Sequence, residues 1–144
     1  MIQGVSSFIR SAQTYTVFHG TDAEFDRFEK GDIGFHFGSE DQAQDRIKDL
    51  PEGKVKKYEI TLDNPYDIVS DLGRWDDMEM LKEYFGEANE GPVEDWSSIK
   101  TPQDFVDEMR RLGYDGIEYL NNFEGANQGQ AYIVFDADNI MEIK

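Results

Sequence analysis

The order of strand-like and helix-like segments constrains this chain more than any other feature. Strand-like segments lie mostly near the two ends of the chain, at residues 14–19, 34–38, 55–62, 116–120, 132–135 and 139–143. Residues 14–19 and 55–62 alternate apolar and polar side chains, which is typical of half-buried strands. Helical spacing lies mainly between the strand-like segments, so the order predicts an α+β domain rather than a series of βαβ units.

Three helices are predicted, each from a start signal. Ser39 and Gln42 form a capping-box pair ahead of a short helix, and Asp76 or Asp77 can cap a second one. Thr101 caps the third helix and is followed by proline, which suits a first helical position. The apolar stripes of the second and third helices are Met78, Leu81 and Phe85, and Phe105, Met109 and Leu112. Such stripes predict helices that bury one face.

The chain has 144 residues and no cysteine. This length suits a single domain, residues 1–144, that buries roughly two-thirds of the surface of the unfolded chain. The lack of cysteine excludes disulfides, thiolate metal sites and cysteine nucleophiles. The sequence shows no signal peptide and no membrane-spanning run, so we expect a cytoplasmic protein.

Acidic residues dominate the composition, since 31 Asp and Glu against 14 Lys and Arg give a formal net charge of −17. This charge repels nucleic acids and anionic membranes, so we expect neither as a partner. Many of the acids lie between Asp63 and Asp95, in what we call the acidic segment. They are Asp63, Asp67, Asp71, Asp76, Asp77, Glu79, Glu83, Glu87, Glu90, Glu94 and Asp95. The segment is either a solvated face or a docking surface for a basic protein target.

The two histidines are the most distinctive polar residues. His19 and His36 are not at helical ligand spacing, and no cysteine can assist them, so we expect no metal site. The sequence also lacks a Gly-x-Ser-x-Gly turn and a glycine-rich phosphate loop. Either histidine alone is more typical of a structural role. Only the order of the motifs around them points to a site.

Three motifs together resemble the ADP-ribosyltransferases of the diphtheria-toxin and poly(ADP-ribose) polymerase type. Residues 17–21 (VFHGT) resemble the first motif of these enzymes, and residues 34–37 (GFHF) resemble the second, where tyrosine is usual. Residues 132–136 (YIVFD) resemble the last catalytic strand. The resemblance is stronger to the compact bacterial and phage members found in polyvalent proteins. It implies split antiparallel sheets around an NAD cleft, and it leaves residues 63–100 as an acidic helical insertion outside the motifs.

The resemblance also implies NAD as the substrate and assigns roles to particular residues. His19 would hydrogen-bond a ribose hydroxyl, and the backbone of Gly20 would hold the nicotinamide amide, with Thr21 beside it. Glycine suits this position because a side chain would keep a planar ring from the backbone. An aromatic ring of the second motif would stack on nicotinamide, a role for His36, Phe37 or Tyr119. The other expected cofactor-binding residues are Ser39 and Tyr132.

The third motif departs from the family pattern. Many relatives have glutamate immediately before the last strand, where this chain has Ala131, preceded by Gln130. A carboxylate there would hold a ribose hydroxyl and stabilise the positive charge that develops as nicotinamide leaves. We favour Glu124 for this role, with Gln130 and then Glu118 as alternatives, so the expected catalytic residues are Glu124, His19 and Gln130.

The function implied by the resemblance is an NAD-dependent mono-ADP-ribosyltransferase that modifies a protein target, as a phage or toxin effector. Its basic target would dock on the acidic segment. Two alternatives stay open. One is a catalytically degenerate binding protein that mimics nucleic acid, which Ala131 and His36 favour. The other is an NAD glycohydrolase, which uses water as the acceptor.

Overall fold

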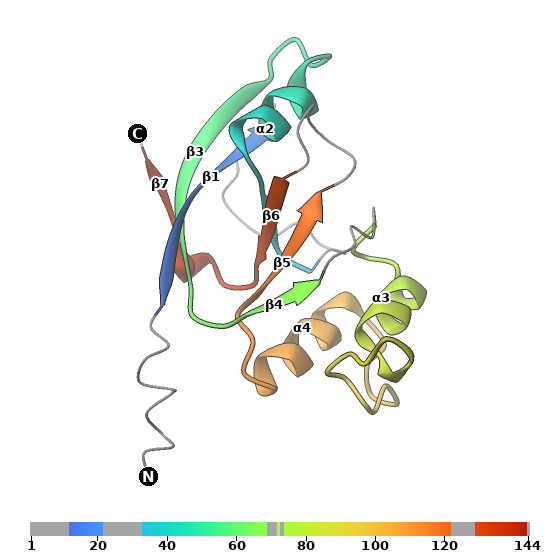
Figure 1. The fold of residues 1–144 in the computed structure, drawn as a ribbon. Coiled ribbons are helices and arrows are strands. Elements are labelled where there is room, and N and C mark those ends of the chain that lie inside the picture. The colour runs from blue at the N-terminus through green and yellow to red at the C-terminus, as the bar shows by residue number, and fades with distance from the viewer. Residues whose placement is uncertain (1–11, 22–32, 69–71, 73, 122–128, 144) are drawn as a thin grey trace.

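The computed structural model describes residues 12–21, 33–68, 72, 74–121 and 129–143 (Figure 1). Its strands are β1 (Gln13–Thr21), β2 (Phe35–Phe37), β3 (Lys54–Leu62), β4 (Pro65–Ile68), β5 (Gly116–Asn121), β6 (Gly129–Val134) and β7 (Ile140–Ile143). Its helices are α2 (Glu40–Ile47), α3 (Met78–Phe85) and α4 (Pro102–Arg111), with short 3-10 helices η1 (Glu87–Asn89) and η2 (Ala137–Asn139). The predicted α+β class is confirmed.

The strands form two sheets. One contains β1-β3-β7, and the other contains β2-β6-β5-β4. Every strand pair is antiparallel except β4 with β5, which run parallel. Phe18 and Gly38 join the sheets through two backbone hydrogen bonds of 2.8 and 2.9 Å. The expected split sheets are thus present, with one parallel pair added at an edge.

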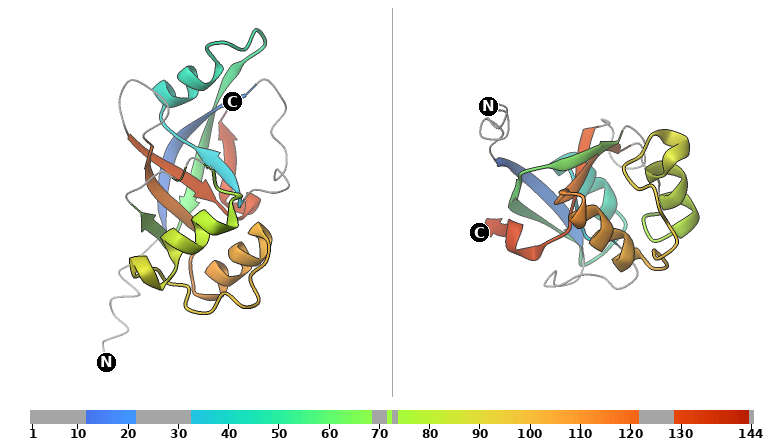
Figure 2. Two further views of the ribbon diagram at one scale, coloured as in Figure 1. Left: turned by 90° about the vertical axis from the view of Figure 1, so that its right-hand side faces the viewer. Right: turned by 90° about the horizontal axis from the view of Figure 1, so that it is seen from below.

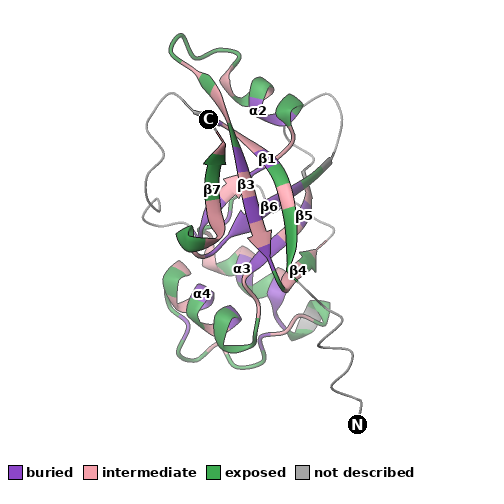
Figure 3. Cartoon of the chain, turned by 90° about the vertical axis from the view of Figure 1, so that its left-hand side faces the viewer, coloured by how far each residue is buried: buried purple, intermediate pink, exposed green. Residues whose placement is uncertain are grey.

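The smaller core lies between the two sheets. Val17 of β1 and Ile60 of β3 are buried there against Phe37 of β2 and Val134 of β6. Burial alternates along β3, because every second side chain points to the other sheet, whereas residues 131–134 of β6 are all buried. Figure 3 shows buried residues along β3 and β6 and exposed ones on α2 and α4.

The larger core lies on the other face of the four-stranded sheet, which α3 and α4 cover (Figure 2). Phe85 of α3 and Phe105 of α4 are fully buried, with their ring centroids 4.9 Å apart. They pack in one cluster with Ile117 and Ile133 of the sheet. Full burial of one such side chain contributes about 1.5–3 kcal/mol. This contact holds both helices on the sheet.

The three predicted helices are confirmed, with caps that follow the sequence signals. Ser39 accepts a hydrogen bond from the Gln42 N–H and completes a capping box, and Thr101 does the same for α4. Of the two candidates for α3, the cap is Asp77. Leu112 does not join the apolar stripe of α4, because it is the C-cap residue and is 36% exposed.

The acidic segment contributes more than helices. Strand β4, which the sequence patterns did not predict, begins at Pro65, because proline is tolerated as the first residue of an edge strand. Leu72 and Trp75 are buried in the larger core beside the α3 side chains. Residues 63–100 are therefore partly a structural element of the domain rather than only a helical insertion.

The helices of the described chain are all short. The longest, α4, has 10 residues. Among the described residues, none forms a helix that is long and apolar enough to cross a membrane.

Candidate functional site

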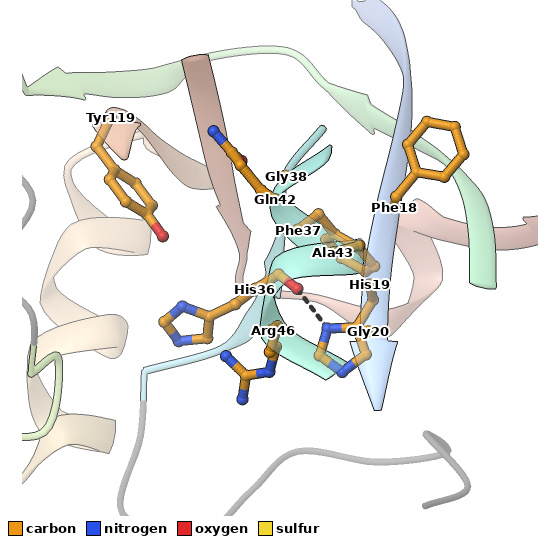
Figure 4. Close-up of a pocket in the computed structure, with 10 residues that line it drawn as sticks. All are labelled: Phe18, His19, Gly20, His36, Phe37, Gly38, Gln42, Ala43, Arg46 and Tyr119. Carbon is orange, nitrogen blue, oxygen red and sulfur yellow. Dashed lines mark hydrogen bonds between the residues drawn. The ribbon is translucent and has the colours of Figure 1, made fainter. Parts of the chain in front are cut away.

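A pocket lies where the end of β1, strand β2 and helix α2 meet (Figure 4). It contains about 370 Å³ of empty space, part of it open to solvent. Its lining residues are Phe18, His19, Gly20, His36, Phe37, Gly38, Gln42, Ala43, Arg46 and Tyr119. Five of the residues predicted from sequence, His19, Gly20, His36, Phe37 and Tyr119, thus come together in one place.

Two glycines allow helix α2 to approach the strands. A Cβ at Gly20 would lie 2.3 Å from the Ala43 carbonyl oxygen, and one at Gly38 would lie 2.0 Å from Gln42 Oε1. Both distances are shorter than non-bonded atoms tolerate. Glycine at position 20 therefore has a packing reason, contact with α2, in addition to the reason suggested by the family.

A backbone carbonyl sets the proton position of His19. Its Nδ1 lies 2.9 Å from the carbonyl oxygen of His36, so Nδ1–H donates and Nε2 keeps its lone pair. Burial lowers the pKa of His19 from 6.5 to about 4, and the charges of Arg46 and Lys56 act in the same direction. The hydrogen bond to His36 opposes this shift. At neutral pH the imidazole is uncharged, with Nε2 as a hydrogen-bond acceptor.

The three candidate stacking rings differ in burial. Phe37 is 3% exposed and its ring lies 6.1 Å from that of His19, edge to face. Tyr119 is 5% exposed and packs against Trp75, with ring centroids 4.9 Å apart. His36 is half-buried, and its ring centroid lies 6.4 Å from that of Trp75, edge to face. His36 therefore offers the most accessible ring of the three.

The other predicted site residues that the structure describes are not among the pocket-lining residues. Ser39 serves as the cap of α2, and Thr21 is the last residue of β1. Gln130 is exposed and belongs to β6, which begins at Gly129, earlier than predicted. Glu124 lies outside the described residues.

Tyr132 and Glu118 face the space between the sheets rather than the pocket. They pair across β5 and β6, and the Tyr132 hydroxyl donates to Glu118 Oε2 at 3.5 Å. Burial, and next the charge of Asp67, raises the pKa of the Glu118 carboxyl. Burial and the charge of Glu118 raise the pKa of Tyr132. The Tyr132 ring packs against Tyr15, with centroids 4.7 Å apart. Both side chains thus take part in sheet packing.

Ala131, where many relatives have glutamate, lies beside the pocket. Ala131 is 1% exposed and pairs with Tyr119, a pocket residue. None of the described residues that line the pocket is acidic. A carboxylate at this site must therefore come from a residue elsewhere in the chain, such as Glu124.

Sequence reasoning missed Arg46 as a pocket residue and gave Gln42 only a capping role. Gln42 is 2% exposed and its amide oxygen accepts the Ser39 N–H at 3.0 Å. Arg46 lies four residues later, on the same face of α2. That spacing, one turn after a cap beside the second motif, is the signal that could have identified it.

Comparisons with known proteins identify the family of the chain. Among the described residues, no three His, Cys, Asp or Glu side chains are placed to hold a metal ion. No curated protein and no solved structure gave a significant match to the chain. A family model, ADP-ribosyltransferase in polyvalent proteins, matches residues 13–144 and so includes the acidic segment. The chain belongs to this family of ADP-ribosyltransferases in polyvalent proteins.

Proposed function

We propose that the chain is an NAD-dependent mono-ADP-ribosyltransferase that modifies a protein side chain. The observation that carries this proposal is His19, held as the Nδ1–H tautomer in a pocket formed by β1, β2 and α2 of an ADP-ribosyltransferase domain. The nicotinamide riboside part of NAD would occupy this pocket.

The described residues would bind and orient this part of the substrate. The Nε2 lone pair of His19 can accept a hydrogen bond from a ribose hydroxyl, because Nδ1–H is already used by the His36 carbonyl. The half-buried His36 ring can stack on the nicotinamide ring. The backbone of Gly20, at the end of β1, can approach the carboxamide.

The reaction breaks the bond between the ribose carbon and the nicotinamide nitrogen, and nicotinamide leaves with the electron pair. The acceptor side chain forms a new bond to that carbon with its lone pair and loses a proton. Positive charge develops on the ribose in between, and a carboxylate stabilises it best. We assign that role to Glu124, because none of the described pocket-lining residues is acidic.

Calorimetry with NAD and an assay of nicotinamide release test the proposal. His19→Ala should weaken NAD binding about tenfold to a hundredfold, because losing one partner in a buried site costs about 1–3 kcal/mol. His19→Asn is the matched variant, since its amide can still donate to the His36 carbonyl but lacks the Nε2 acceptor. It should fold like wild type and bind NAD as poorly as His19→Ala. Wild-type protein that gives no heat with millimolar NAD would refute the cofactor assignment.

The acidic segment is the proposed docking surface for a basic target protein. Glu79, Glu83 and Glu87 are exposed along α3 and η1, whereas Asp77 caps α3 through the N–H groups of Glu79 and Met80. Neutralising the three glutamates to glutamine therefore removes charge without removing the cap. This variant should modify the target more slowly, with a weaker salt dependence, and should hydrolyse NAD without target at the wild-type rate.

A matched control for this variant is available elsewhere on the surface. Glu52, Asp138 and Glu142 are exposed and lie outside the acidic segment. Their neutralisation changes the net charge equally and should leave the modification rate near that of wild type. Equal rates for both triple variants would contradict docking on the acidic segment.

The degenerate binding protein remains the second candidate, because the described pocket-lining residues include no acid and Ala131 stands at the third motif. Such a protein would inactivate its partner at stoichiometric amounts, whether or not NAD is present. A transferase would do so catalytically and only with NAD. Comparing partner inactivation with and without NAD separates the two.

A further inference from the structure

One short stretch of this acidic chain is basic. Residues 46–57 contain five of the 14 Lys and Arg residues and only two acids. The rest of the chain has 9 basic and 29 acidic residues. The stretch is therefore a local positive region on a molecule whose overall charge repels anions. Its position relative to the His19 pocket determines which anion it can bind.

The basic stretch borders the His19 pocket. Arg46 of α2 lines the pocket, and Figure 4 shows its guanidinium beside the rings of His19 and His36. Lys56 of β3 lies directly opposite His19 of β1 in the antiparallel pair. Opposed residues of such a pair carry their side chains on the same face of the sheet. Two cations from different elements thus flank one imidazole.

The electrostatics of His19 agree with this placement. Burial is the main cause of its lowered pKa, and the positive charges of Arg46 and Lys56 also lower it. Both charges therefore act at the imidazole. A dianionic group beside His19 would meet two cations there, on a molecule whose net charge of −17 repels anions overall.

We propose that Arg46 and Lys56 hold the pyrophosphate of the dinucleotide at the mouth of the His19 pocket, an inference that rests on the proposed use of NAD. The planar guanidinium of Arg46 donates two parallel hydrogen bonds to phosphate oxygens, and Lys56 acts as a point charge. The pair makes the site selective for substrates that carry a pyrophosphate. Nicotinamide riboside, which lacks phosphate, gains nothing from either residue.

Charge-removing variants test this subsite. Arg46→Gln and Lys56→Gln are compared with Lys57→Gln, the matched control. Lys57 neighbours Lys56 but pairs with Phe18, so its side chain points to the opposite face of β3. Calorimetric titrations use NAD, nicotinamide riboside and inorganic pyrophosphate as separate probes.

We expect Arg46→Gln and Lys56→Gln to weaken NAD binding about tenfold or more, and Lys57→Gln to change it less than about twofold. All three variants should bind nicotinamide riboside like wild type. The NAD affinity of wild type should fall steeply with salt, and that of Arg46→Gln less so.

Two results would overturn the inference. One is that Arg46→Gln and Lys56→Gln bind NAD with the same affinity as Lys57→Gln. The other is an equal loss of affinity for NAD and nicotinamide riboside, which would mean that the variants disturb the pocket itself. Failure of the proposed function looks different, because wild type would then not bind NAD. Pyrophosphate binding that depends on Arg46 would still support the anion subsite in that case.

Discussion

Replacing His19 by asparagine should make protein stability less dependent on pH. The folded state holds the pKa of His19 at about 4, whereas an unperturbed histidine titrates near 6.5. As the pH falls below about 6.5, the unfolded chain takes up a proton at this position before the folded chain does. His19 therefore costs stability progressively between about pH 6.5 and 4, and contributes no such cost above that range.

The size of this effect follows from the two pKa values. Between about pH 7 and pH 5, proton uptake by the unfolded chain lowers the free energy of unfolding by roughly 2 kcal/mol. Asparagine does not titrate, and its amide can replace Nδ1–H as donor to the His36 carbonyl. The many carboxylates also make the free energy of unfolding depend on pH, but their contributions should cancel when wild type and His19→Asn are compared.

Urea denaturation at both pH values gives the two free energies. Wild type should lose roughly 2 kcal/mol more than His19→Asn between about pH 7 and pH 5. NMR provides a direct check, since the chain has 2 histidines and His19→Asn identifies one resonance by its loss. The ¹⁵N shifts of that imidazole should show a protonated Nδ1. Equal pH dependence in both proteins, or an Nε2–H tautomer, would refute the reasoning.

Three further predictions concern the same region. Gly20→Ala should destabilise the fold by about 1–3 kcal/mol, because its Cβ would lie 2.3 Å from the Ala43 carbonyl oxygen. Thermal unfolding measures this loss, and an unchanged midpoint would show that α2 can move away. Ser39→Ala should cost about 1 kcal/mol through loss of the helix cap, measured by urea denaturation, whereas Ser39→Gly should cost only a few tenths. Glu124→Gln should preserve NAD affinity yet slow nicotinamide release about a hundredfold or more, because its interaction acts chiefly in the transition state. Wild-type turnover in that variant would end the assignment of Glu124.

Local signals were sufficient for much of the fold. Capping boxes at Ser39 and Thr101 and the cap at Asp77 predicted the helix starts, because a cap depends on residues three positions apart. Local patterns located six of the seven strands in the described part of the chain, because strand-forming residues bounded by turn signals are local features. The missed strand, β4, begins at a proline and pairs with β5, about 50 residues later in the chain. Its formation depends on a partner that no local pattern reveals.

The candidate site, like the fold, depends partly on local sequence and partly on tertiary structure. The motif order identified His19, Gly20 and His36, because their types and neighbours are local properties of the chain. Only the tertiary structure decided that the His36 carbonyl sets the tautomer of His19, and that Lys56 lies opposite it. These contacts join residues 17 and 37 positions apart, so they depend on strand register and helix packing rather than on neighbouring residues. The sequence thus determined which groups are available, and the packing of α2 and β3 against β1 determined the charge and the hydrogen-bonding direction with which His19 faces the pocket.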